Sequence, residues 1–166
     1  VNIMLGFAFI KSKPTTFIAQ YRSGRVLRQG EGLSFFYFAP TCTIVSIDIS
    51  SVDVPFVFEE TTNDFQEVTI QGQMTYRVVE PLQLSKALDF SIDRRGRYVS
   101  DDPSKLSERL IQATQIASRT FIQSKDLANV LIASDQLGTE LTGAVQNSAA
   151  SKMLGVEVLS VAVLSI

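Results

Sequence analysis

The 166-residue sequence contains no histidine and no tryptophan, and it has a single cysteine. Because histidine is the commonest general base and metal ligand, its absence excludes Ser-His-Asp and Cys-His catalytic arrangements. Cys42 has no second cysteine to pair with, and its apolar neighbours favour a small buried side chain over a reactive thiol. Zinc-binding and glycine-rich phosphate-binding motifs are also missing. The sequence therefore predicts no catalytic residue, no cofactor and no metal site, and leaves a Ser–Lys hydrolase as the one enzymatic alternative.

Charged residues are scarce as well, at 19% of the chain with a net charge of −2, which argues against a nucleic-acid partner. Their distribution is uneven, because residues 1–30 hold five basic residues and no acidic one. The apolar stretch VNIMLGFAFI precedes these bases and is too short to span a bilayer. An apolar run followed by bases is typical of a segment held against an anionic cytoplasmic leaflet. An apolar first strand with a solvated basic face explains the pattern equally well.

Strict alternation of apolar and polar residues from Val68 to Val79 predicts a long, half-buried central strand, which Pro81 ends. Further strands are predicted around a Ser23–Gly24 turn, in LSFFYFAP, and from Thr43 to a break at Pro55. A two-faced strand buries only two of the four consecutive aromatic residues of FFYF. The other two are then exposed, or are covered by something outside the domain.

The second half of the chain changes to helical periodicity. A helix is predicted from Asp102 with an apolar stripe at Leu106, Leu110, Ala113, Ala117 and Phe121. A short helix to Ile132 follows, then one from Ser134 whose buried side extends to Met153 and which Gly155 ends. The final stretch, VEVLSVAVLSI, predicts a strand that is covered on both faces.

These elements predict an α+β fold, with a compact α/β variant as the alternative. The first half is predicted to form one antiparallel sheet, and helices from the second half pack against it. The C-terminal strand closes the same sheet. Between the helices, Arg94-Arg95-Gly96-Arg97 is interpreted as a solvated loop or as a binding patch.

Three motifs resemble the SPFH domain, also called band 7, of stomatins, prohibitins and flotillins. RQGEGLSFFYFAP resembles the segment that opens the domain, and MLGVEVLSVAVLSI with the preceding helices resembles its end. TTNDFQEVTIQGQMTYRVVEP is similar to its core pattern, with Glu80 in place of Asp. The matching positions are Thr62, Asp64, Val68, Ile70, Gly72, Met74, Tyr76, Arg77, Val78 and Pro81. Ala133-Ser134-Asp135 departs from relatives that carry an Arg there, which leaves the subfamily open.

The resemblance implies a membrane-associated, non-enzymatic scaffold that forms homo- or hetero-oligomers with SPFH-family subunits. It also implies organisation of membrane microdomains and regulation of a membrane protease or channel, at the cytoplasmic face. Residues 1–16 are then a membrane-proximal segment and 17–166 the SPFH domain, followed by a coiled coil. The candidates for membrane contact are Phe7, Phe9, Ile10, Lys11, Lys13, Arg22, Arg25, Arg28, Phe35, Phe36, Tyr37 and Phe38. The alternative from another class is a soluble protein-binding module that uses an exposed sheet edge.

Overall fold

A computed structural model describes residues 5–166 of the chain, so the first four residues of the predicted membrane-proximal segment lie outside the described residues. The chain divides into two compact units. The first unit combines the residues up to Ser50 with Glu80–Lys105. The second unit combines Ser51–Val79 with Leu106–Ile166.

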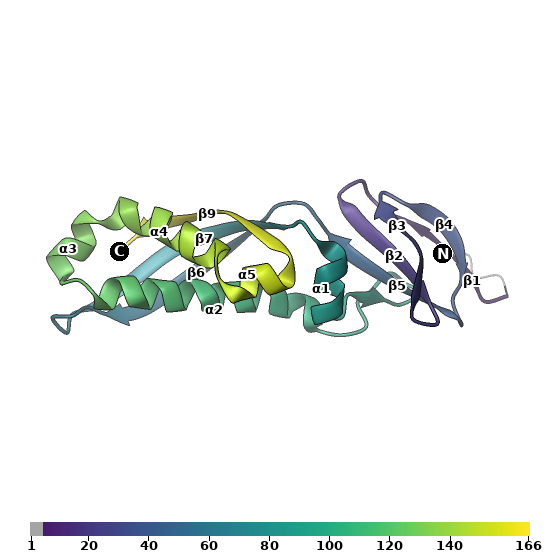
Figure 1. Ribbon diagram of the computed structural model, residues 1–166, viewed down its shortest axis with the longest axis horizontal. Coiled ribbons are helices and arrows are strands. Elements are labelled where there is room, and N and C mark those ends of the chain that lie inside the picture. Colours follow the sequence, from purple (N-terminus) through teal and green to yellow (C-terminus); the bar gives the residue numbers. More distant parts are fainter. Residues whose placement is uncertain (1–4) are drawn as a thin grey trace. The chain divides into compact units, whose positions relative to one another are not determined.

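The first unit contains two antiparallel sheets in its described part (Figure 1). A two-stranded ribbon pairs β1 with β4, and a four-stranded sheet has the order β3-β2-β5-β8. The bounds of these strands are β1 Phe7–Lys11, β2 Thr16–Arg22, β3 Arg25–Glu31, β4 Ser34–Phe38, β5 Cys42–Asp48 and β8 Ser91–Ile92. The ribbon packs on the larger sheet through a cluster of buried side chains that includes Ala8, Ile18 and Ile44.

The predicted turn between β2 and β3 is confirmed. Ser23 and Gly24 both have positive φ angles, of 52° and 75°. Two consecutive residues with positive φ match the right-handed twist of the flanking strands, which is why such turns join tight hairpins. This turn leads directly into Arg25, at the start of β3.

The second unit is built on a three-stranded antiparallel sheet of order β6-β7-β9. Its strands are β6 Val52–Thr61, β7 Glu67–Val78 and β9 Val156–Ser165. β7 is the predicted central strand, and it lies between the other two with alternate residues buried. The prediction of one sheet is wrong, because the strands before Ser50 form their own sheets in the first unit.

The helices are α1 Pro81–Ala87, α2 Asp102–Gln123, α3 Leu127–Ile132, α4 Ser134–Gln146 and α5 Ala149–Leu154. They confirm the α+β class together with the antiparallel sheets. The buried side of α2 carries Thr114 and Ser118 where the prediction had Ala113 and Ala117. The hydroxyl of Thr114 lies 3.6 Å from the sulfur of Met74 in β7, so α2 packs against the three-stranded sheet of the second unit.

The predicted single helix from Ser134 to Met153 is wrong, because α4 ends at Gln146 and α5 begins at Ala149. The Ser148 side chain accepts a hydrogen bond from the backbone N–H of Ser151 and so starts the new helix as its N-cap. As a result Met153 is exposed instead of buried. Gly155 ends α5 with φ 63° and ψ 42°, as predicted from its freedom in the left-handed region.

The predicted strand break at Pro55 is also misplaced. The chain turns after Asp48, whose carboxylate accepts hydrogen bonds from the backbone N–H and the hydroxyl of Ser50. Pro55 lies inside β6 instead, and β6 is an edge strand of its sheet. An edge strand tolerates proline because one side of its backbone needs no ladder partner.

The closing strand β9 pairs with β7, as predicted, but it is not covered on both faces. A register shift opposite Thr75 and Tyr76 changes the side to which successive residues point. Val158 and Val161 are therefore both buried, while Leu159 and Leu164 are exposed.

Candidate functional site

The β1–β4 ribbon presents four phenylalanine side chains on its outer face. Phe7 lies opposite Phe38 and Phe9 lies opposite Phe36 in the register of the two strands. Alternate residues of a strand share a face, so these four side chains point to the same side. Their exposed fractions are 51% for Phe7, 40% for Phe9, 71% for Phe36 and 38% for Phe38. We call this set of four residues the phenylalanine face.

The rings of the phenylalanine face pack in two cross-strand pairs. The ring centroids are 5.2 Å apart for Phe7 and Phe38, and 4.7 Å apart for Phe9 and Phe36. Cross-strand aromatic pairs of this kind stabilise a sheet by about 0.2–1 kcal/mol each relative to alanine. The pairing holds the rings in place while leaving much of their apolar surface in water. Fully burying a side chain such as Phe contributes roughly 1.5–3 kcal/mol, so this face would gain from an apolar partner.

The inner face of the same ribbon belongs to the core of the first unit. Phe35 and Tyr37 alternate with the exposed phenylalanines and are buried against Ile18 and Ile44. Ile10 packs against this cluster and is half-buried. Phe35 and Tyr37 therefore support the phenylalanine face from behind and do not lie on it.

Exposed basic side chains lie at the end of β1 and at the turn between β2 and β3. Lys11 and Lys13 are exposed at the end of β1 and just beyond it. Arg22 lies opposite Arg25 across the β2–β3 turn, and both are exposed. Within residues 5–166, none of these four side chains has an acidic partner within salt-bridge distance.

Arg28 is bound differently from the other bases. Its guanidinium group lies 4.6 Å from the centre of the Phe35 ring, which gives a cation–π contact with a core residue. It thereby connects the exposed edge strand β3 to the inner face of the ribbon. The structure thus brings Arg28 close to the aromatic cluster, and it places Arg22 and Arg25 at the turn between β2 and β3.

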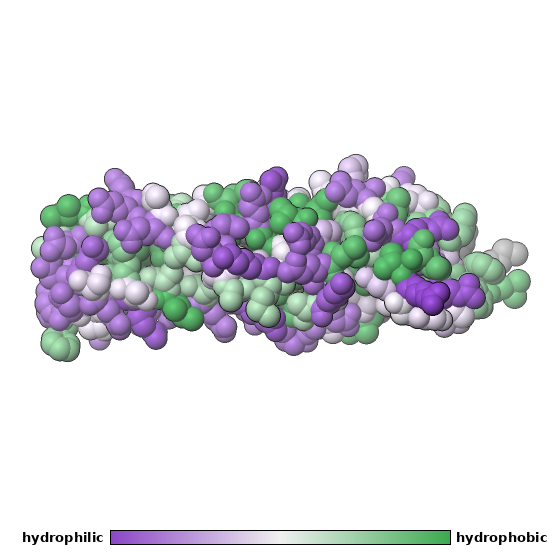
Figure 2. Space-filling view, in the orientation of Figure 1, coloured by the Kyte–Doolittle hydropathy of each residue, from purple (hydrophilic) through white to green (hydrophobic). Residues whose placement is uncertain are grey.

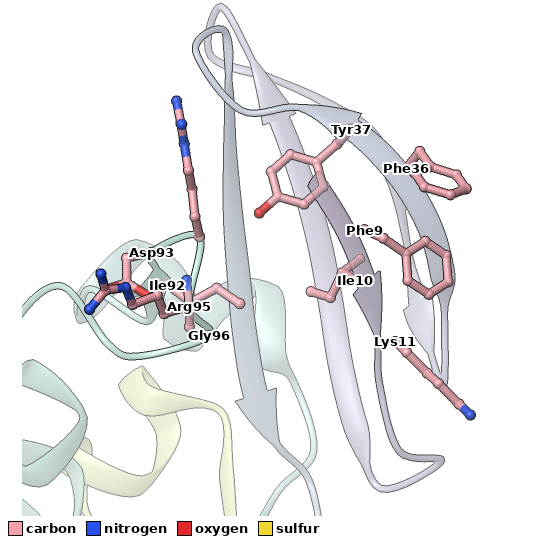
Figure 3. Close-up of a pocket in the computed structure, with 10 residues that line it drawn as sticks. Phe9, Ile10, Lys11, Phe36, Tyr37, Ile92, Asp93, Arg95 and Gly96 are labelled. Atoms are coloured by element: carbon pink, nitrogen blue, oxygen red, sulfur yellow. Dashed lines mark hydrogen bonds between the residues drawn. The ribbon is translucent and has the colours of Figure 1, made fainter. Parts of the chain in front are cut away.

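A pocket of about 730 Å³ lies between the ribbon and the turn after β8 (Figure 3). The ribbon contributes Phe9, Ile10, Lys11, Phe36 and Tyr37, and the other wall is Ile92–Gly96. The predicted solvated loop around Arg94 is thus one wall of a concavity. Sequence reasoning left the binding-patch alternative open but could not pair the loop with the ribbon, because residues 9–11 and 92–96 are distant in the chain.

Figure 2 shows hydrophobic atoms at the right-hand end of the view, where Figure 1 places β1 and β4, with hydrophilic groups beside them.

The sequence FAFIK already indicated an apolar outer face on β1. Phe7, Phe9 and Lys11 alternate with Ala8 and Ile10, which is the period of a strand with one apolar outer face. The register with β4 then decides which of the FFYF aromatics join them.

The chain matches the family model described as SPFH domain / Band 7 family over residues 10–166. It belongs to this family. The search of curated proteins returned no match to the chain. SPFH-family proteins are typically associated with membranes, generally form oligomers and generally act as non-enzymatic scaffolds. Membership of the family supports, at this coarse level, an SPFH-type membrane-associated scaffold.

The family's core motif has a structural explanation in this SPFH domain. Thr62 and Asp64 form the turn between β6 and β7, and the Thr62 hydroxyl accepts a hydrogen bond from the backbone N–H of Gln66. A carboxylate oxygen of Asp64 also accepts one from the backbone N–H of Leu127, at the start of α3. Thr62 and Asp64 therefore fasten the β6–β7 turn to a helix. In the part of the chain that the structure describes, no helix is both long and apolar enough to cross a membrane.

Proposed function

We propose that this SPFH domain lies against an anionic membrane surface and contacts it through the phenylalanine face. The observation that supports the proposal most directly is the clustering of four partly exposed phenylalanines on one side of one ribbon. Soluble surfaces rarely keep contiguous apolar patches without a partner for them. A two-stranded ribbon with aromatic rings outward is suited to the membrane interface, where an apolar side chain can leave water without spanning the bilayer.

The exposed basic residues of the first unit supply the second part of the proposal. Lys11, Lys13, Arg22 and Arg25 would face anionic headgroups, which attract each basic residue near the surface by about 1 kcal/mol. The cytoplasmic leaflet carries such headgroups, so we propose the cytoplasmic face as the location. Arg28 would contribute its charge while it remains against the Phe35 ring.

We further propose that the domain acts within homo- or hetero-oligomers of SPFH-family subunits that organise membrane microdomains and modulate a membrane protease or channel. The second unit does not itself require a partner subunit. Helix α2 covers the apolar face of its sheet with buried residues that include Leu110 and Phe121, so this face is not available for assembly. We therefore expect the 166-residue chain to be a monomer or weak dimer in dilute solution. A stable large oligomer, measured by light scattering, would contradict this division between the domain and a following coiled coil.

Flotation with phospholipid vesicles tests the membrane contact. The chain should float with vesicles of phosphatidylcholine mixed with phosphatidylserine, and the double variant F7S/F38S should lose most of this binding. L131S/I132S is the matched control, because Leu131 and Ile132 are 52% and 82% exposed but belong to the second unit. Equal loss in both variants, or no loss in F7S/F38S, would show that the phenylalanine face does not mediate membrane contact.

Charge reversal tests the basic part separately. The variant R25E/R28E should weaken binding to the anionic vesicles by about 1 kcal/mol per residue, and the loss should shrink as salt is raised. Binding that is unchanged at low salt would contradict a role for these two side chains.

A further inference from the structure

The single cysteine of the chain lies at the border between an apolar cluster and a group of polar side chains. Cys42 begins β5 and is half-buried, so part of the residue is open to solvent. Its sulfur accepts a hydrogen bond from Nε2 of Gln20, at 3.3 Å. The hydroxyl of Thr41 lies 3.8 Å from the same sulfur. Cys42 therefore has polar partners that the apolar run TCTIVSIDI around it did not indicate.

Gln20 is buried with an unsatisfied acceptor. It is only 5% exposed, yet its Oε1 atom has no hydrogen-bond partner within residues 5–166. In the β2–β5 register Cys42 lies opposite Arg22, two residues along the strand from Gln20, so Gln20 and Cys42 share one face of the sheet. A buried amide oxygen normally accepts a hydrogen bond. The amide that contacts the sulfur therefore has an unused acceptor, which a proton donor attached to the sulfur would satisfy.

Arg22 places a positive charge at the same end of the sheet. It lies directly opposite Cys42, and residues in that relation have β-carbons about 4.5–5.5 Å apart. The Arg22 side chain is exposed, and in the described part of the chain it has no acidic partner within salt-bridge distance. Cysteine reacts as the thiolate, so a cation beside it attracts the charge that the sulfur carries when it reacts.

We propose that Cys42 is a site of reversible oxidation by hydrogen peroxide, and that Gln20 stabilises the sulfenic acid formed there. The thiolate sulfur attacks one peroxide oxygen, so an S–O bond forms and the O–O bond breaks. The leaving hydroxide takes up the proton that the thiol released and becomes water. The sulfur loses two electrons and the peroxide gains them. A small thiol then condenses with the sulfenic acid to a mixed disulfide and water, and a second thiol releases the cysteine.

The product of this step supplies the hydrogen-bond donor that Gln20 lacks. The new S–O–H group donates to Oε1 of Gln20, which satisfies the buried acceptor and keeps the sulfenic acid in its neutral form. Oxidation to sulfinic acid needs a nucleophilic, deprotonated sulfur group, so an acceptor that retains the proton slows this next step. The added oxygen lies beside the buried cluster that joins the ribbon to the four-stranded sheet, where it can alter the packing of the ribbon.

Mass spectrometry of the 166-residue chain tests the site without lipid. The reduced chain would be treated with hydrogen peroxide, sampled over time, labelled with dimedone, which traps sulfenic acids, and digested. Peptides must be analysed because Met153 is 70% exposed and also gains oxygen. The sulfenic acid of Cys42 should persist about fivefold longer in the folded chain than in urea, as one hydrogen bond of about 1 kcal/mol predicts. C42S should give no adduct.

Two results of this experiment would overturn the proposal. One is a folded chain that gives no dimedone adduct at Cys42. The other is a sulfenic acid that persists no longer in the folded chain than in urea. Both comparisons use the parent chain and so do not depend on whether any variant folds.

A pair of glutamine variants separates the role of Gln20 from a general effect of burial. Q20L removes the acceptor and should shorten the lifetime of the sulfenic acid about fivefold, with more sulfinic acid formed. Q29L is the matched control, because Gln29 is exposed on β3 and should leave the lifetime unchanged. Circular dichroism checks that both variants are folded. A folded Q20L with the parental lifetime would overturn the proposal.

A charge variant addresses the first step. R22Q should slow the formation of the sulfenic acid several-fold and leave its lifetime unchanged, because the charge acts on the thiolate and the amide acts on the product. An unchanged rate of formation would contradict the part assigned to Arg22.

Oxidation of Cys42 does not depend on the membrane contact, and the two proposals can fail separately. F7S/F38S should lose vesicle binding and still form the sulfenic acid as the parent does. Reduced C42S should float with anionic vesicles as the parent does and give no adduct. A chain that forms a long-lived sulfenic acid but never floats supports the oxidation site and contradicts the membrane contact. A chain that floats but gives no adduct does the reverse.

Discussion

The hydroxyl of Thr142 in α4 accepts a hydrogen bond from the backbone N–H of Val161 in β9, at 2.9 Å. One turn further along the helix, the Gln146 side chain accepts the N–H of Val158, at 2.6 Å. These two N–H groups lie in the last strand of the sheet, where no further strand follows in the order β6-β7-β9. Helix α4 therefore occupies the sheet edge that an unprotected strand would offer to another chain.

Replacing Thr142 with valine should destabilise the second unit by about 1–3 kcal/mol, because the buried N–H of Val161 loses its acceptor. Urea unfolding followed by circular dichroism measures the change. Thr139→Val is the matched control, since Thr139 is exposed on the same helix and should alter stability by only a few tenths. Similar losses in both variants would mean that valine in α4 is itself the cause.

Gly72→Ala should destabilise the chain severely, by roughly 3 kcal/mol or more, because a β-carbon in this strand meets a backbone atom that cannot move. The atoms that it meets are the carbonyl oxygen of Ala162 and the ring of Phe56. Gly143→Ala is the opposite case: nothing lies within 4 Å of its added β-carbon, so the variant should gain up to about 1 kcal/mol of helix stability. Thermal unfolding of the two variants should therefore shift in opposite directions. A tolerated Gly72→Ala would show that β9 can separate from β7.

Val161→Asp should cost several kcal/mol, enough to unfold a marginal domain, because the side chain is 4% exposed in the sheet that α2 covers. Leu164→Asp in the same strand places the same charge on an exposed position and should change stability little. Comparing the two variants separates the stability lost by burying a charge from the stability lost because aspartate is a poor strand former. A V161D protein that melts within a degree or two of the parent would show that the strand is peripheral.

The folded protein should become less stable at alkaline pH because of two tyrosines in the first unit. Burial raises the pKa of Tyr37 and of Tyr98 above the ordinary value of 10.0. Folded protein then holds these protons more tightly than unfolded protein does, so stability is fully present below pH 10 and falls as pH rises above it. Ultraviolet titration of tyrosinate should lose one late-ionising group in Y37F and another in Y98F. A parent titration without late groups would show that neither hydroxyl is shielded from water in the folded protein.

The sequence determined the elements whose signal is local. The alternation from Val68 to Val79 set the central strand, Ser23-Gly24 set a turn, and Gly155 set the end of a helix, because strand period and positive φ depend on neighbouring residues. The α+β class follows from the order of those elements, and the family resemblance rests on the residues of three motifs. The same local reasoning misplaced the break at Pro55, because whether a proline is tolerated depends on whether its strand lies at an edge.

Tertiary structure alone decided which residues meet. The alternation of FFYF predicts that two aromatics are exposed, but only pairing with β1 places Phe36 and Phe38 beside Phe7 and Phe9. Arg94 and Arg95 appeared as charges in a loop until the fold set them opposite Tyr37. The physical reason is the same in both cases: contacts across long sequence separations are selected by the burial of the whole core, and no local pattern encodes them.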